Sequence, residues 1–297
     1  MHYRQLGKSA LQVSEIGFGC MSLAEDTAAN TVLLHKAIDA GINFFDTADL
    51  YQQGMNEEMV GKALKEKRNS VIIATKVGNQ WRSDGSGWDW NPRKEYILKA
   101  VEKSLQRLQT SHIDLYQLHG GTIDDPIDET IDAFEQLQQQ GKIRYYGISS
   151  IRPNVIREYI SRSHITSIMM QYSLLDRRPE EYMELLQQHG IGILSRGSLA
   201  KGLLAGKPPT AYLNHNEEAV GKAAAAIRLV TKTGETLSQT AARFVLSQPA
   251  VSSAVVGIRT EAQLKDIVAA RDLSPLTEHE MKALTQSIPA NYYDSHR

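Results

Sequence analysis

The chain is poor in cysteine and carries almost no net charge. Its 297 residues include one cysteine, Cys20, which excludes an internal disulfide framework and a cysteine-based zinc site. Cysteine poverty also suits a reducing compartment. The formal net charge is −1 at pH 7, so no basic surplus points to nucleic acid or to an anionic membrane as a partner.

Long apolar runs are missing as well. The first residues, Met1 to Gly7, lack the apolar core of a signal peptide, and no window is long enough to span a bilayer. We therefore expect a cytoplasmic protein without a membrane partner. No spaced set of histidines and carboxylates suggests a metal site, and no nucleophile–base pair suggests a hydrolase.

What the chain does have is a repeated strand–helix pattern. Eight apolar segments have strand character: residues 16–21, 42–46, 71–76, 113–118, 143–148, 165–170, 191–195 and 251–256. Helical periodicity follows each of them, as in the stripe of Leu33, Leu34 and Ala37. Such alternation predicts a parallel sheet, and eight units without a linker favour a closed barrel over an open sheet. We predict an α/β fold: a (β/α)8 TIM barrel, a single domain over residues 1–297, with a short amino-terminal β-hairpin within residues 2–16.

Two helix starts can be assigned from residue type. Asn56 is the expected cap of a helix over residues 56–66. Asp125 is the expected cap of the helix that follows residue 118, with Pro126 in the first helical position.

A dinucleotide-binding Rossmann fold is the main α/β alternative. Gly17 and Gly19 begin like its glycine fingerprint, but Ser22 stands at the third glycine position. No acidic residue ends a second strand in the required context, so we reject this fold.

Ionisable residues lie at the ends of three successive predicted strands. They are Asp46 with nearby Tyr51, then Lys76, then His119. Each alone has an ordinary structural interpretation, but the carboxyl ends of barrel strands converge on one face. Reduction of a carbonyl group needs such a set, because hydride attack leaves charge on oxygen that an acid must neutralise.

The four residue types suit that task. A phenol is a weak acid, with an ordinary pKa of about 10. We expect the ammonium of Lys76 to make Tyr51 a stronger acid, Asp46 to keep Lys76 charged and oriented, and a neutral His119 to donate to the same oxygen.

The motifs around these residues resemble the signatures of the aldo-keto reductase family. The segments are Gly17–Met21, Asp46–Tyr51, Ala74–Lys76 and Asp114–His119, in the order that the family has them. The resemblance extends over essentially the whole chain. It implies a bacterial NADPH-dependent aldo/keto reductase with Asp46, Tyr51, Lys76 and His119 as catalytic tetrad and Tyr51 as general acid.

The resemblance also implies a cofactor site. Its residues are Gly19, Cys20, Met21, Ser149, Ser150, Gln171, Arg196, Gly197, Ser198, Leu199, Lys201, Gly202, Gly257, Arg259, Gln263 and Asp266. Two positions depart from the family pattern: Ser150 stands where Asn is usual, and Arg196 stands where many members place an aromatic residue against the nicotinamide ring. Arg259 matches the position that grips the adenosine 2′-phosphate and favours NADPH over NADH.

Three tryptophans, Trp81, Trp88 and Trp90, fall in one loop over residues 78–91. They either form a wall of the substrate pocket or pack the loop itself, and both interpretations stay open.

Two functions remain. The first is NADPH-dependent reduction of small-molecule aldehydes or ketones by a monomer or weak oligomer. The second is a cofactor-binding regulatory module of the potassium-channel β-subunit type, which the family also contains. The absence of an additional amino-terminal docking segment favours the enzyme.

Overall fold

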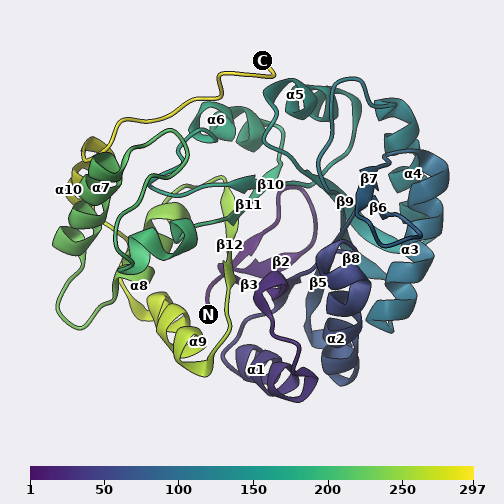
Figure 1. Cartoon of the computed structure of the whole chain (residues 1–297), viewed down its shortest axis with the longest axis horizontal. Helices are drawn as coiled ribbons and strands as arrows, with labels where there is room; N and C mark the ends of the chain where they lie inside the picture. Colours follow the sequence, from purple (N-terminus) through teal and green to yellow (C-terminus); the bar gives the residue numbers. More distant parts are fainter.

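The computed structural model describes residues 1–297, and its centre is a closed barrel of eight parallel strands (Figure 1). In their order around the barrel these are β10 (Ser167–Gln171), β11 (Gly192–Arg196), β12 (Val251–Gly257), β3 (Ile16–Gly19), β4 (Phe44–Asp46), β5 (Ile72–Val77), β8 (Ile113–Leu118) and β9 (Ile143–Ser149). The predicted (β/α)8 barrel is confirmed.

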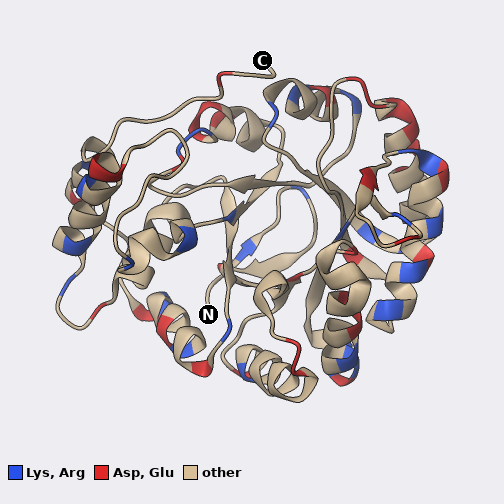
Figure 2. Ribbon diagram, in the orientation of Figure 1, with Lys and Arg blue, Asp and Glu red and all other residues tan.

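Helices surround the barrel (Figure 1). The α-helices are α1 (Thr27–Asp39), α2 (Met55–Leu64), α3 (Lys94–Leu108), α4 (Ile127–Gln139), α5 (Pro153–Arg162), α6 (Glu180–Gln188), α7 (Glu217–Val230), α8 (Leu237–Leu246), α9 (Glu261–Val268) and α10 (Glu278–Gln286). Short 3₁₀ helices are η1 (Cys20–Ser22), η2 (Tyr51–Gly54), η3 (Lys65–Ser70), η4 (Ala200–Ala205) and η5 (Ala269–Asp272). Acidic and basic residues are intermixed over the outer helices (Figure 2). None of the helices has both the length and the apolar composition for a membrane span.

The predicted amino-terminal hairpin closes one end of the barrel. Strands β1 (Tyr3–Gln5) and β2 (Gln12–Ser14) pair in antiparallel fashion. Leu6, Leu11 and Val13 join one apolar cluster with interior side chains of the barrel strands. Gly7 (φ +53°) lies so close to the starts of β10 and β11 that a Cβ there would be 2.3 Å from the Thr166 carbonyl oxygen. The hairpin therefore covers the end opposite to the carboxyl ends of the strands.

Both predicted helix caps are wrong. Asn56 lies inside α2, where its Nδ2 donates to the Cys20 carbonyl (2.9 Å) and its Oδ1 accepts from Thr47 Oγ1 (2.7 Å). Asp125 accepts from the Thr122 amide instead of capping α4, which begins at Ile127. Asn56 has partners on other elements instead, and Asp125 is taken up by a local turn at Thr122 and by Trp90 Nε1 (2.9 Å).

Candidate active site

A cavity of about 1260 Å³ opens at the carboxyl ends of the barrel strands. Asp46, Tyr51, Lys76 and His119 all line it, although 73 residues of chain separate the first from the last. Pockets for small ligands usually measure roughly 300–1000 Å³, so this cavity has room for more than one small molecule.

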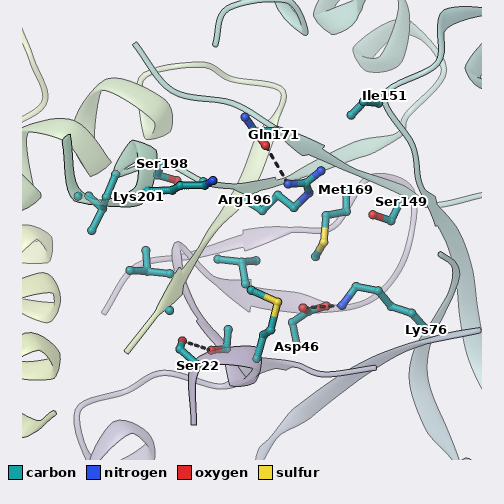
Figure 3. A pocket seen from close by; sticks show the side chains of 18 of the residues that line it. Ser22, Asp46, Lys76, Ser149, Ile151, Met169, Gln171, Arg196, Ser198 and Lys201 are labelled. Atoms are coloured by element: carbon teal, nitrogen blue, oxygen red, sulfur yellow. Dashed lines mark hydrogen bonds and ion pairs between the residues drawn. The ribbon is translucent and has the colours of Figure 1, made fainter. Parts of the chain in front are cut away.

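Lys76 is the centre of the four. Its Nζ donates to Asp46 Oδ2 (2.6 Å), to the Thr47 carbonyl (2.7 Å) and to Tyr51 Oη (3.3 Å). An ammonium has three protons, so its donor capacity is fully used. The side chain is almost completely buried and cannot reorient towards solvent. Lys76 thereby fixes the Tyr51 hydroxyl relative to the Asp46 carboxylate (Figure 3 shows the Asp46–Lys76 pair).

A strained turn carries Tyr51 into the cavity. The two residues that follow it, Gln52 (φ +50°) and Gln53 (φ +55°), both have left-handed backbone conformations, and so does Gly54 (φ +90°). Such conformations are costly for residues other than glycine and tend to persist at functional sites. The turn lies within η2, between β4 and α2, and leads directly into α2.

His119 lies against the ring of Tyr51. The two ring centroids are 5.9 Å apart and the planes meet at 84°, an edge-to-face contact. Burial, followed by the positive charges of Lys76 and Arg196, lowers the pKa of His119 to about 3. The imidazole is therefore neutral near pH 7, as expected, and its buried Nδ1 has no hydrogen-bond partner.

The charge pair and the phenol respond to burial in different ways. Burial acts to lower the pKa of Lys76, but the Asp46 carboxylate and Tyr51 raise it above its ordinary value. Burial raises the pKa of Tyr51, and Lys76 offsets only part of that rise. Lys76 thus makes Tyr51 a stronger acid, as expected, but the loss of hydration outweighs the ammonium and keeps the pKa of Tyr51 above its ordinary value.

The residues proposed for a cofactor are brought together along the same cavity. All of them except Cys20 line it, from Gly19 beside β3 through Ser149 and Gln171 to Asp266 on α9. Cys20 is fully buried, and the pKa of its thiol is raised by burial. Its side chain does not line the cavity, unlike its neighbours Gly19 and Met21. The sequence motif could not give the direction of this side chain.

The loop after β11 has the shape of an anion cradle. Gly197, Ala200, Lys201 and Gly202 all have positive φ angles, which fold the chain back on itself at the start of η4. Lys201, Lys207 and Arg259 line this part of the cavity, and none of them forms an ion pair in the structure. Left-handed turns and unpaired cations together suit phosphate groups.

Two of the residues proposed for the cofactor, Gln263 and Asp266, already form hydrogen bonds within the protein. Gln263 Oε1 accepts from the Arg259 amide (2.9 Å), and Asp266 Oδ1 accepts from Thr236 Oγ1 (2.8 Å). Asp266 Oδ1 also accepts from Gln239 Nε2 (3.1 Å), and both residues line the cavity. Arg259 keeps its whole guanidinium available.

Gln171 and Arg196 form a polar pair at the ends of β10 and β11. Arg196 Nη1 donates to Gln171 Oε1 (2.9 Å), and Gln171 Nε2 donates to Tyr212 Oη (3.1 Å). Figure 3 shows the Arg196 side chain between Gln171 and Met169, inside the cavity. A cation, Arg196, thus lines the cavity at the position where many members of the family have an aromatic residue.

The tryptophans do not line the cavity. Trp81 and Trp90 belong to a small hairpin, β6 (Asn79–Trp81) and β7 (Trp88–Trp90), which the sequence did not suggest. The Trp90 ring packs on Gly78 and Gly120, and its Nε1 donates to Asp125 Oδ1 (2.9 Å). Trp90 therefore supports the backbone next to His119 from outside, and this placement fits the loop-packing interpretation.

Sequence reasoning missed several cavity residues. They are Ser22, Leu50, Arg152, Arg178, Lys207 and Tyr212. The tail segment Tyr293–His296 also lines the cavity. The tail crosses the carboxyl face from α10 towards α6 and α5 (Figure 1), held by a bond from the Asn154 amide to the His296 carbonyl (2.8 Å).

The barrel and the four side chains at its carboxyl face define an oxidoreductase of the (β/α)8 type, and comparison with known proteins identifies the family. The profile of the Aldo/keto reductase family matches residues 15–289. The chain therefore belongs to the aldo/keto reductase family.

The chain is similar to known proteins over all or nearly all of its length. The uncharacterized oxidoreductase YqkF of Bacillus subtilis is 49% identical, with all of both chains covered. The solved aldo-keto reductase AKR11C1 of Bacillus halodurans is 50% identical in its holo form, with a TM-score of 0.95 over 100% of this chain and 99% of that one. Its apo form gives a TM-score of 0.87 over the same shares, at 48% identity. A probable voltage-gated potassium channel subunit beta of Arabidopsis thaliana is 28% identical over 93% of each chain.

Proposed function

We propose that this oxidoreductase reduces aldehydes and ketones to alcohols with NADPH, and that Tyr51 is the proton donor. The observation that carries the proposal is the Lys76 Nζ–Tyr51 Oη bond of 3.3 Å inside the cavity at the carboxyl ends of the strands. A donor that is fixed by a buried ammonium is suited to an oxygen on which negative charge develops.

The four side chains have separate roles in the proposed reaction. Tyr51 donates its proton to the carbonyl oxygen, and water later returns a proton to the phenolate. Lys76, charged and held by Asp46, stabilises the phenolate as it forms. His119 is neutral and orients the carbonyl oxygen by a hydrogen bond. When bound, NADPH supplies the hydride that forms the new C–H bond.

The cavity fits that cofactor. Unpaired Lys201 and Lys207 lie with the left-handed loop after β11, where they would hold the pyrophosphate. Arg259 precedes the amino-terminal end of α9, and its guanidinium would hold the 2′-phosphate that distinguishes NADPH from NADH. Ser149, Ser150 and Gln171 are the proposed partners of the carboxamide, with Gly19, Met21, Ser198, Leu199 and Gly257 as further contacts.

Steady-state turnover tests the proposal. Multiple turnovers of NADPH with 4-nitrobenzaldehyde or methylglyoxal are expected, and Tyr51→Phe should lower kcat by about 10²- to 10⁴-fold because it removes the acid. Tyr3→Phe is the matched control, since Tyr3 Oη bonds to the Gly41 carbonyl at the other end of the barrel. Full activity of Tyr51→Phe would contradict the assignment.

The regulatory-module alternative makes the opposite prediction. It requires tight cofactor binding without turnover on a broad panel of carbonyl compounds. No feature of the cavity favours it over the enzyme, because the donor, the ammonium and the neutral imidazole are all in contact.

A further inference from the structure

Arg196 is a cation of the active-site cavity without an acidic partner. It ends β11 and is exposed to the cavity, and its side chain bonds only to the neutral amide of Gln171 (2.9 Å). No carboxylate lies within ion-pair distance of it. A guanidinium stays charged at every physiological pH, so this position carries an uncompensated positive charge.

The field of that charge reaches the reacting groups. After burial and Lys76, Arg196 is the third influence on the pKa of His119, and it also acts on the pKa values of Tyr51 and Asp46. Lys76 is the other cation near these groups, but its charge is neutralised by Asp46 at 2.6 Å. Arg196 therefore supplies the net positive potential of this part of the cavity.

We propose that Arg196 makes the site distinguish the two oxidation states of its cofactor, so that NADPH binds more tightly than NADP⁺. This inference rests on the proposed function. A hydride can reach the carbonyl carbon only from a ring that lies beside Tyr51 and His119, within the field of Arg196. The reduced nicotinamide ring is neutral and the oxidised ring is positive, so the cation repels only the oxidised form.

The other cations of the cavity do not make this distinction. Arg178 is paired with Asp176 (2.7 Å), and Arg152 donates to the Gly121 carbonyl. Lys201, Lys207 and Arg259 are placed for phosphate groups, which are identical in the two forms of the cofactor. Two like charges at a partly exposed site differ from a charge–neutral pair by roughly five- to tenfold in affinity. The preference would speed the release of oxidised cofactor, while the overall equilibrium of the reaction stays unchanged.

Binding titrations of the full chain test the inference. The dissociation constants of NADPH and NADP⁺ are measured by fluorescence for the native protein and for Arg196→Met, Arg196→Lys and Arg259→Met. Arg196→Met should lower the ratio of the NADP⁺ to the NADPH constant by roughly five- to tenfold, because the repulsion is lost. Arg196→Lys should keep most of the ratio. Arg259→Met should weaken both forms by the same factor and leave the ratio unchanged.

The salt dependence of the ratio provides a second measurement. Raising the ionic strength should shrink the ratio for the native protein but not for Arg196→Met, since screening acts on the charge pair. A ratio that is the same in the native protein and Arg196→Met, or that ignores salt in the native protein, would overturn the inference. The proposed function fails separately, through absence of NADPH turnover in the native protein.

Discussion

Burial governs the protonation states of His119 and Tyr51, two of the proposed catalytic side chains, more than their charged neighbours do. His119 and Tyr51 both move in the direction that keeps the uncharged form: the pKa of His119 falls to about 3, and the pKa of Tyr51 rises above its ordinary value. Loss of hydration is the largest cause in both cases. Between these limits Tyr51 keeps its proton and His119 stays neutral.

The rate of carbonyl reduction should therefore be nearly independent of pH over a wide range. We expect kcat to stay level from about pH 5 to pH 9 and to fall only as Tyr51 loses its proton, above the ordinary phenol pKa of about 10. The sign follows from the donor role, since a raised pKa extends the protonated form towards higher pH. A stopped-flow or steady-state pH profile checks this. A break near pH 6.5 that disappears in His119→Gln would show that the histidine titrates in the working range.

The site was predictable where chemistry depends on position along the chain. Asp46, Lys76 and His119 lie at the ends of predicted strands, and closure of the barrel brings these ends to one cavity. Side-chain direction was not predictable, because it depends on tertiary contacts. Cys20 turns away from the cavity, and Trp90 packs behind Gly120 instead of facing a substrate.

At the scale of elements, strands and helical faces were predicted well and helix ends less well. The apolar stripe of α1 is buried as expected, with Leu33, Leu34 and Ala37 all covered. The caps at Asn56 and Asp125 failed because those side chains serve contacts between elements. Elsewhere the caps are local: Thr236 and Thr277 begin α8 and α10 with reciprocal capping boxes.

Thr277→Ala should destabilise the protein by about 1 kcal/mol, because the first turn of α10 loses the acceptor for the Glu280 amide (3.2 Å). The matched control is Thr285→Ala in the same helix. Thr285 Oγ1 bonds only to carbonyls of its own helix, those of Met281 (2.9 Å) and Lys282 (3.2 Å). Alanine is the better helix former there, so little change or a small gain is expected. Urea denaturation measures both. Equal losses in the two variants would mean that threonine packing, not capping, is the source.

At the scale of the whole molecule, the barrel separates stability from chemistry. The hairpin β1–β2 and its apolar cluster close the amino-terminal end, and the cavity with Tyr51 opens at the other. Barrel enzymes carry their chemistry on the carboxyl face, so the packing at the hairpin end has no direct part in it. The hairpin should act on folding and leave the catalytic geometry intact.

Leu6→Ala tests that separation. Leu6 is fully buried in the cluster beneath the barrel, so its truncation leaves a cavity and should cost about 2–5 kcal/mol of unfolding free energy. Leu229→Ala is the control of the same chemistry, because Leu229 is 83% exposed and should change stability by less than about 0.5 kcal/mol. Denaturant melts give the free energies, and kcat is measured where circular dichroism shows each variant to be folded. We expect kcat of Leu6→Ala to equal that of the native protein. A lower kcat in the folded variant would show that packing at the hairpin end is transmitted through the strands to Lys76 and Tyr51.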